Sequence, residues 1–251
     1  MSIYKGTVEL GALYKCSEPL PRPGRPWLID LSILQPYEGL TPGDIADFSE
    51  NPDWTQWQLG DTPLQKSTRL QWHVLEEDGR TLLICDRVIL AKVSWHDLNQ
   101  AGFVNGAAIE IDGRPWTCRL LTGGNLPRHT ADGYSRGMPA DNEWDSYVVN
   151  EKAIDGLPVP SESDIDPVLS AADLASAHNQ FWNWMGVNSW VRDPHGVRET
   201  ARCCRGYASA QFFYTNTFDH RHEDIGWRPV LVSSEGLINL SLLNKHAKEI
   251  L

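Results

Sequence analysis

The sequence contains no apolar run that approaches the roughly 20 residues of a membrane-spanning helix. Its opening stretch, MSIYKGTVELGALYKC, has neither an unbroken apolar segment nor a clear cleavage site, which predicts synthesis in the cytoplasm without a secretory signal. Basic residues are also few: the 22 Lys and Arg are outnumbered by 33 Asp and Glu, which gives a net charge of −11. Phosphate neutralisation needs clustered basic side chains, so this balance predicts no nucleic-acid partner.

Cysteine is scarce and irregularly spaced. The five cysteines form no Cys-x-x-Cys pair and are odd in number, which predicts neither a zinc site nor a disulfide framework. We therefore expect reduced, mostly buried thiols of the kind found in cytosolic proteins. A bond between the adjacent Cys203 and Cys204 would be strained, and on a strand the two side chains would point to opposite faces. They cannot chelate one ion together, and we expect one of them to lie in the core.

Tryptophan, by contrast, is abundant, with 11 residues in a chain of 251. An indole ring favours burial, and its N–H then needs an acceptor. We expect a core rich in indoles, with a binding surface that carries some of them as the alternative.

The first part of the chain differs in composition from the rest. Residues 17–65 are rich in Pro, Gly and Asp, which predicts an extended, loop-rich stretch with little regular structure. We divide the chain into an extended N-terminal segment, residues 1–68, and a single domain, residues 69–251. A chain of this length can bury a substantial core.

Local signals within the second part predict hairpins and short helices. Asp78-Gly79 and Asp112-Gly113 each separate two runs of strand-forming residues and predict a hairpin. Ser94 is expected to cap a helix that carries Asp97 three residues later and stops at Gly102. Hairpins mixed with a few short helices indicate an α+β fold.

Three further segments are less regular. Residues 123–141 are expected to form a long loop, which in a compact domain is usually functional or flexible. Asp141 is expected to cap a short helix over residues 142–152. Residues 166–182 carry apolar side chains at helical spacing and predict another helix.

Several spaced segments together resemble one family. They are CRLLT (118–122) followed by NEWDSY (142–147), then FWNWMGVNSW (181–190), RCCRGYAS (202–209) and DIGWRPV (224–230). In this order they resemble the signature segments of formylglycine-generating-enzyme-like domains. The resemblance covers roughly residues 70–232 and implies an elaborated C-type lectin fold. Leu121 and Tyr207 depart from the family pattern, and a long loop separates the first two segments.

Four arginines of these segments are expected to be buried or half-buried, and such cations need carboxylate or carbonyl partners. They are Arg119, Arg202, Arg205 and Arg228, with Glu143, Asp145, Asp193 and Asp224 as available carboxylates. On this interpretation most of the residues in the family segments form the scaffold.

The resemblance implies an enzyme only if the family's catalytic residues are present. Sulfatase-activating members bind copper through two cysteines that follow the Arg-Gly-Gly-Ser strand, whereas here both cysteines precede Arg205-Gly206. The His-x3-His-x-Glu site of the related iron-dependent sulfoxide synthases does not occur in the sequence. We therefore predict a non-enzymatic protein with no catalytic residue and keep a formylglycine-generating-enzyme-like oxidoreductase as an alternative.

A metal site is considered at His220 and His222, which would share one face of a strand, with Asp219, Glu223 and Asp224 nearby. Two histidines without a defined third ligand favour a solvated polar loop, so we predict no cofactor and no metal. A structural calcium ion held by backbone and carboxylate oxygens stays open as an alternative, because this fold often uses one.

The segment near residues 183–223 is predicted to be a ligand-binding surface. Its aromatic side chains supply contact area at low entropic cost, and Asn and His supply adaptable hydrogen bonds. The predicted ligand-binding residues are Asn183, Asn188, Arg192, Tyr207, Gln211, Phe213, Tyr214, Asn216, Phe218, His220 and His222.

This interleaving of polar and aromatic residues with scaffold residues resembles the variable proteins of diversity-generating retroelements, which include phage receptor-binding tips and bacterial surface displays. The resemblance implies a receptor-binding or display protein for a protein, peptide or glycan ligand, associated with a virion or cell surface through a partner. A homo-oligomer is compatible with this role. The second alternative is a phage or assembly structural protein whose aromatics are buried at a subunit interface.

Overall fold

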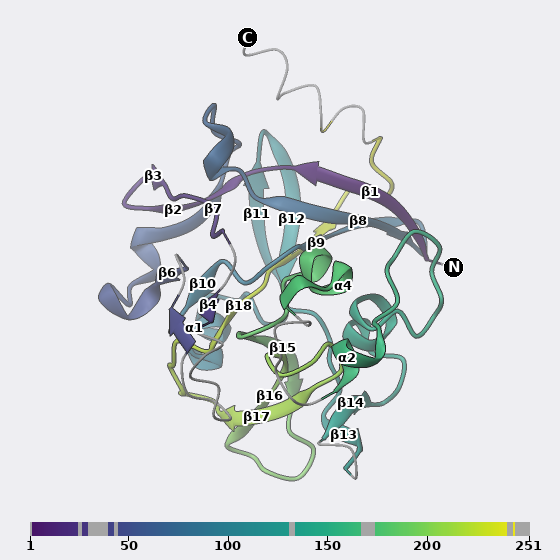
Figure 1. Ribbon diagram of the computed structural model, residues 1–251. Coiled ribbons are helices and arrows are strands. Elements are labelled where there is room, and N and C mark those ends of the chain that lie inside the picture. Colours follow the sequence, from purple (N-terminus) through teal and green to yellow (C-terminus); the bar gives the residue numbers. More distant parts are fainter. Residues whose placement is uncertain are drawn as a thin grey trace.

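A computed structural model describes residues 2–24, 27–29, 40–42, 45–130, 134–166, 174–239 and 243, with backbone alone at 27–29 and 40–42. Two six-stranded sheets dominate the fold, and Figure 1 shows the first sheet above the second. The few helices are short, so the chain is an α+β protein. No described helix is long and apolar enough to span a membrane.

The first sheet is antiparallel throughout. Its spatial order is β1 (Ile3–Glu9), β8 (Gln71–Glu77), β9 (Arg80–Cys85), β19 (Val230–Ser233), β12 (Arg114–Arg119) and β11 (Ala107–Ile111). Both predicted hairpins are confirmed in it, because β8 leads into β9 and β11 into β12. Asp78, Gly79, Asp112 and Gly113 all have positive φ, as the two-residue turns of tight hairpins require.

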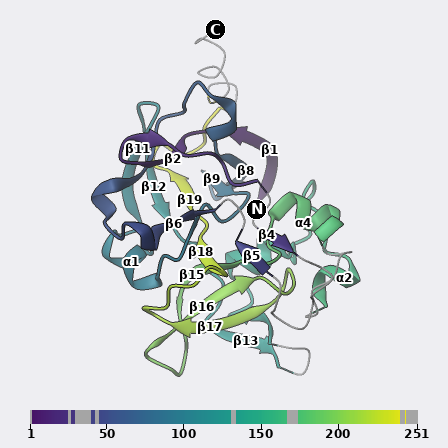
Figure 2. The ribbon, with the colours of Figure 1, turned by 60° about the vertical axis from the view of Figure 1, so that its left-hand side comes forward.

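The second sheet mixes directions, with β15 parallel to β18 and β10 parallel to β6. Its order is β17 (Phe213–Thr217), β16 (Ala201–Gly206), β15 (Asn188–Pro194), β18 (Ile225–Trp227), β10 (Leu90–Ala91) and β6 (Ala46–Asp47). Figure 2 shows β15, β16 and β17 together, with β18 leading from them toward β19 of the first sheet.

The remaining described elements are small. The strands are β2 (Ala12–Lys15), β3 (Glu18–Pro19), β7 (Trp57–Gly60), β4 (Trp27–Ile29), β5 (Leu40–Pro42), β13 (Leu126–His129) and β14 (Ser135–Met138). The helices are α1 (Trp95–Gln100), α2 (Glu162–Ile165), α4 (Ala177–Trp182), a π-helical turn η4 (Trp144–Val148) and the 3-10 turns η1 (Phe48–Glu50), η2 (Trp54–Gln56) and η3 (Lys66–Thr68).

Helix α1 follows the predicted capping pattern. The Ser94 side chain accepts a hydrogen bond from the backbone N–H of Asp97, and the Asp97 carboxylate accepts one from the Ser94 N–H. Gly102 then takes a positive φ of 81°, which ends the helix. The prediction of this helix is confirmed.

The two loop and helix predictions around residues 123–152 are wrong. Residues 126–138 contain the hairpin β13–β14 instead of a loop, because Arg128 and Asp145 bind the backbone of Gly137 and hold the two strands in place. The helix after it is a single π-helical turn, and Asn142 takes the role predicted for Asp141: its Oδ1 accepts the N–H of Asp145 at 2.9 Å.

The helix predicted for residues 166–182 is shorter in its described part. Helix α4 begins after Ser176, whose hydroxyl accepts the N–H of Asn179, and it ends at Asn183 with φ 49°. Residues 167–173 of the predicted helix lie outside the described residues.

The core extends across the predicted boundary between residues 68 and 69. Strand β1 pairs with β8, and Val8 and Leu13 pack in the same hydrophobic cluster as Trp72. Residues 1–68 are therefore not separate from the domain. The described part of residues 17–65 still contains only strands of two to four residues and 3-10 turns, as a Pro- and Gly-rich stretch predicts.

Hydrophobic side chains pack on both faces of the first sheet. Leu83 and Cys85 of β9 point into one cluster, and Leu82 and Ile84 point into the other. Seven of the 11 tryptophans are almost completely buried, which confirms the expected indole-rich core. They are Trp72, Trp116, Trp144, Trp182, Trp184, Trp190 and Trp227.

Candidate functional site

Arg205 is the centre of the scaffold beneath the predicted ligand-binding segment. It lies on β16, has no exposed side-chain surface, and donates from Nη2 to Asp145 Oδ1 at 2.6 Å. Its Nη1 donates to the Gly123 carbonyl at 2.8 Å, and Nε donates to the Phe212 carbonyl at 3.1 Å. Such a fully partnered cation fixes the strand and its connecting loops in one arrangement.

Arg228, just after β18, is equally buried, but the groups that accept its hydrogen bonds are neutral. It donates to the carbonyls of Trp182 at 2.7 Å and of Asn183 and Cys85 at 3.2 Å, and to Ser189 Oγ at 3.0 Å. Burial without a directly bonded carboxylate lowers the pKa of Arg228 to about 10, so its guanidinium is still charged at neutral pH.

The other two predicted scaffold arginines are half-buried. Arg119 makes a two-pronged contact with Glu143 at 2.7 and 2.6 Å, whereas Arg202 lies 4.5 Å from the centre of the Trp95 ring and donates to backbone carbonyls. The predicted burial and pairing of all four arginines is thus confirmed. Asp193 has another role, since it accepts the N–H of Gly123 at 2.7 Å.

Cys203 and Cys204 point to opposite faces of β16, as predicted, and each joins a different hydrophobic cluster. Both are buried, whereas we expected only one of them in the core. Burial raises the pKa of Cys203 to about 12 and the pKa of Cys204 well above its ordinary value. Both thiols therefore stay protonated at neutral pH in the metal-free chain.

Five of the eleven predicted ligand-binding residues are buried, so they offer little side-chain surface to a ligand. They are Asn183, Asn188, Tyr207, Gln211 and Phe213. Their polar groups serve the scaffold: Asn183 donates to the Asp86 carbonyl, Asn188 to the Asp224 carbonyl and Gln211 to the Ile165 carbonyl. Aromatic and polar composition does not reveal which way a side chain points when the backbone is irregular, and Tyr207 has a positive φ of 76°.

The other six predicted residues are half-buried or exposed: Arg192, Tyr214, Asn216, Phe218, His220 and His222. They come from β15, from β17 and from the turn after β17. Tyr214 lies near the start of β17, whereas His220 and His222 lie in the turn that follows the strand. Phe218 packs its ring 5.5 Å from that of His96 on α1.

A hollow of about 310 Å³ opens beside Tyr214, and we call it the aromatic groove. It is lined by Pro127, Tyr134, His195, Arg198, Phe213, Tyr214 and Thr215. Tyr134 is 57% exposed and Tyr214 is 49% exposed, which is unusual for such large rings in a chain with a tryptophan core. The stacked ring of Phe212 supports Tyr214, with centroids 5.9 Å apart.

Two polar side chains on the loop between β15 and β16 complete the aromatic groove. Arg198 donates to Thr215 Oγ1 at 3.0 Å, so its guanidinium is held against β17. Partial burial and the charge of Arg198 lower the pKa of His195, which is therefore neutral at pH 7. Sequence reasoning missed Tyr134, His195 and Arg198, because they lie in irregular stretches outside any recognisable motif.

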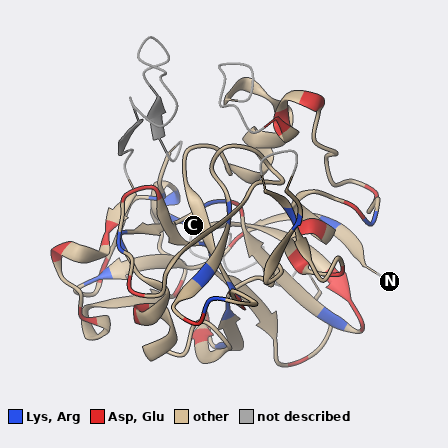
Figure 3. Ribbon diagram, turned by 90° about the horizontal axis from the view of Figure 1, so that it is seen from below, with Lys and Arg blue, Asp and Glu red and all other residues tan. Residues whose placement is uncertain are grey.

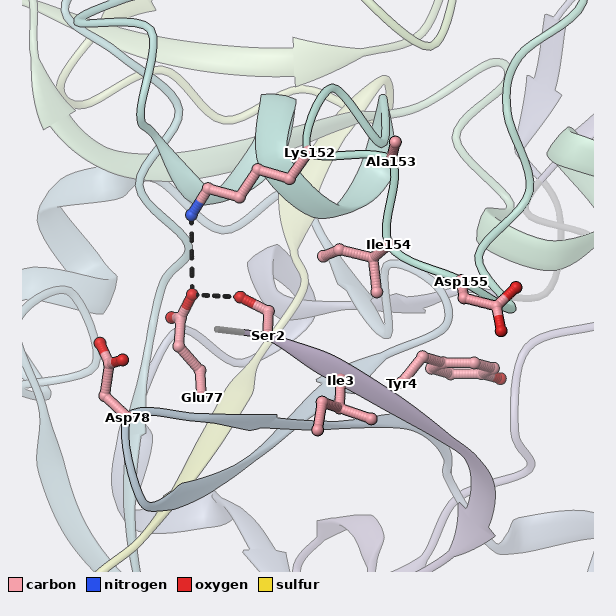
Figure 4. Close-up of a pocket in the computed structure, with 9 residues that line it drawn as sticks. All are labelled: Ser2, Ile3, Tyr4, Glu77, Asp78, Lys152, Ala153, Ile154 and Asp155. Carbon is pink, nitrogen blue, oxygen red and sulfur yellow. Dashed lines mark hydrogen bonds and ion pairs between the residues drawn. The ribbon is translucent and has the colours of Figure 1, made fainter.

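A second hollow, of about 630 Å³, lies at the open end of β1 and β8. Figure 4 shows Glu77 at its edge, facing Ser2 and Lys152. The Glu77 carboxylate accepts hydrogen bonds from Ser2 and Tyr147 and lies 3.6 Å from the Lys152 ammonium. Burial opposes its ionisation, but these contacts together lower the pKa of Glu77. Its partners fasten the first strand to the fold and leave it poorly suited to proton transfer.

The residues that line the two hollows differ in charge: Arg198 lines the aromatic groove, whereas Glu77, Asp78 and Asp155 line the second hollow with Lys152. Figure 3 shows basic positions interspersed among acidic ones along the ribbon, in keeping with the net charge of −11. No family model, no curated protein and no solved structure matches the chain.

Proposed function

We propose that the chain is a non-enzymatic ligand-binding protein and that the aromatic groove is its binding surface. The observation that carries the proposal is the pair of exposed rings, Tyr134 and Tyr214, beside the anchored guanidinium of Arg198. A tyrosine has few rotatable bonds, so it contributes contact area to a complex at low cost in conformational entropy. Hollows of this size and mixed polarity accommodate one sugar ring or one large side chain of a peptide or protein.

The rigidity of the groove supports this role. Phe213 packs beneath it, with its ring centre 5.7 Å from the Arg205 guanidinium carbon, and its N–H donates to the Tyr134 carbonyl at 2.7 Å. The binding residues thus stand on a part of the scaffold that the buried Arg205 holds through several hydrogen bonds. Preorganisation of this kind reduces the entropy lost on binding. The buried thiols of Cys203 and Cys204 disfavour the oxidoreductase alternative.

We also propose the C-type-lectin-like fold of the formylglycine-generating-enzyme type for the chain. The family segments appear in order in the sequence, and the paired Arg119 and Arg205 sit in two of them. The proposal of diversification by a retroelement is supported by the sequence alone. Substitutions introduced in this way would have to fall on exposed positions, because substitutions of buried residues would destabilise the scaffold. A near-copy of the coding segment that differs only at adenines, beside a reverse transcriptase gene, tests this part; its absence removes the claim.

The binding proposal is tested by screening the purified chain against a glycan array and a random peptide display library. We expect ligands whose affinity falls about tenfold or more in Tyr134→Ala and in Tyr214→Ala, as for aromatic residues central to an interface. Leu64→Ala is the matched control, because Leu64 is 65% exposed and lies outside the groove. Ligands that bind the tyrosine variants and the wild type equally well would place the binding surface elsewhere. A screen in which no probe binds above background would contradict the binding function.

A further inference from the structure

The turn after β17 carries a cluster of metal-ligating side chains that the proposed function does not use. It contains His220, His222 and Asp224, and one ligand atom of each lies within 4.8 Å of those of the other two. The aromatic groove is lined by none of these residues, so the cluster is a separate feature of the surface.

The backbone that carries the cluster is anchored before any ligand binds. Arg221, between the two histidines, donates two hydrogen bonds to Asp97 at 2.8 and 2.6 Å, and the Asp97 carboxylate also accepts the N–H of Ser94, the residue that caps α1. The His222 carbonyl accepts the N–H of Lys92 at 3.3 Å. A turn held at Arg221 and at His222 keeps the two neighbouring imidazoles close together.

Asp224 is anchored from the other side. Its carbonyl accepts the backbone N–H of Asn188 at 2.6 Å and the Asn188 side-chain amide at 3.3 Å. Asn188 is the first residue of β15, so the backbone of Asp224 is fixed to the central strands of the second sheet. The cluster thus combines ligands whose backbones are each fixed, which lowers the entropic cost of assembling them around an ion.

The spacing of the donor atoms suits a small cation. His222 Nδ1 lies 2.8 Å from Asp224 Oδ1, and the two imidazole rings stack with centroids 5.7 Å apart and planes at 18°. Zinc bonds to nitrogen and oxygen are about 2.0–2.1 Å long, which puts neighbouring ligand atoms around one ion about 3 Å apart. Small side-chain rotations are enough to bring His220 into the same shell.

The two atoms also have few other partners among the described residues. The backbone N–H of Asp224 lies 3.4 Å from His222 Nδ1, which is a long contact. Asp224 Oδ1 is shielded from water and accepts no hydrogen bond from the described residues. A shielded carboxylate oxygen is stabilised by a cation beside it, and a metal ion held between Asp224 and His222 would be such a cation.

We propose that His220, His222 and Asp224 bind one divalent transition-metal ion, with Zn²⁺ as the best-fitting one. Two imidazoles and one carboxylate are ligands typical of zinc and its neighbours in the first transition series. Calcium and magnesium prefer shells made of oxygen, so the cluster does not suit the calcium ion considered from the sequence. Three protein ligands leave a fourth position for water.

The test uses the untagged full-length chain, stripped with a chelator and titrated with Zn²⁺ by calorimetry. We expect one Zn²⁺ per chain, a higher melting temperature with zinc, and affinity that falls at least about tenfold in His222→Asn and in Asp224→Asn. His129→Asn is the matched control, because His129 is an exposed histidine on β13, and it should bind Zn²⁺ as the wild type does. Equal zinc binding by all of these variants would overturn the proposal.

Cobalt substitution keeps the test decisive if a variant fails to fold. Co²⁺ bound to the wild-type chain by imidazole and carboxylate should give visible d–d bands without the charge-transfer absorption of a thiolate. Thiolate absorption would assign the metal to a cysteine and refute the site. Absence of any Zn²⁺ or Co²⁺ binding would show that a proton alone lies between His222 and Asp224, which also refutes it.

Discussion

Each of the two sheets combines two hairpins with three pairings between distant strands, but the first sheet is antiparallel throughout and the second contains two parallel pairs. Tight two-residue turns connect β8 to β9 and β11 to β12, whereas β15, β16 and β17 are joined by longer loops. In the second sheet, β18 lies between β15, about 35 residues earlier in the chain, and the still more distant β10. A parallel pair cannot be closed by a tight turn, so the second sheet needs contacts that hold remote segments together.

Buried arginines supply those contacts in the second sheet. Arg205 connects β16 to the loops at Gly123 and Asp145, and Arg228 connects β18 to the end of α4. None of the described ion pairs of the first sheet is fully buried: Arg119 with Glu143 is half-buried, and Lys5 with Glu76 lies nearer the surface. The comparison therefore predicts that the two sheets respond differently to the loss of a charge.

Loss of the buried carboxylate should have the largest effect. Asp145→Ala leaves the fully buried Arg205 without its anionic partner, and breaking a buried pair in this way costs about 3–5 kcal/mol of unfolding free energy. Glu76→Gln in the first sheet is the control and should cost less than about 1 kcal/mol. Urea unfolding of both variants measures the difference. Similar small losses in the two variants would show that the second sheet does not depend on its buried arginine.

Acid should weaken the first sheet through a buried histidine. His73 Nε2 on β8 donates to the Phe181 carbonyl at 2.9 Å, and burial lowers the pKa of His73 from 6.5 to about 4. The unfolded chain binds a proton below pH 6.5 and the folded chain does so only near pH 4, so stability is lost as pH falls through this window. The loss from His73 is about 3 kcal/mol.

Unfolding free energies measured between pH 7 and pH 4 test this loss, with His73→Leu as the variant. The slope of stability against pH should decrease in His73→Leu, although its stability at pH 7 is lower. His178 has a lowered pKa too, so part of the slope should persist. An unchanged slope in the variant, or an imidazole of His73 that titrates near pH 6.5 in NMR spectra of the folded chain, would contradict the prediction.

The parts of the fold that obey local rules could be predicted from the sequence. Asp-Gly turns, the capping of α1 by Ser94 and the need of Arg205 for a carboxylate all follow from a few neighbouring residues or from one buried charge. The hairpin β13–β14 could not be predicted. It depends on the carboxylate of Asp145, which accepts the N–H of Gly137 at 2.7 Å from a residue outside the hairpin.

The candidate site also combines features that neighbouring residues predict with features that depend on distant residues. Tyr214, which the interleaving of aromatic and polar residues singled out, lines the aromatic groove, and its role in ligand binding stays a prediction. The direction of each side chain was not predictable, since Tyr207 and Gln211 leave the regular pattern of β16 and turn inward. The sequence did not single out Tyr134, because it lies just before β14, in a hairpin that depends on long-range contacts.

The smallest effect should come from a turn residue of the first sheet. Gly113 has φ +70° and open space where a Cβ atom would lie, so Gly113→Ala meets no clash. The cost is the strain of a left-handed alanine, about 1 kcal/mol, and Gly113→Asn should cost less because asparagine tolerates this conformation. Thermal unfolding of the two variants checks both values. A larger loss of stability in Gly113→Asn than in Gly113→Ala would mean that space around the turn, and not backbone conformation, limits the residue at this position. The first sheet would then depend, like the second, on contacts beyond its local sequence.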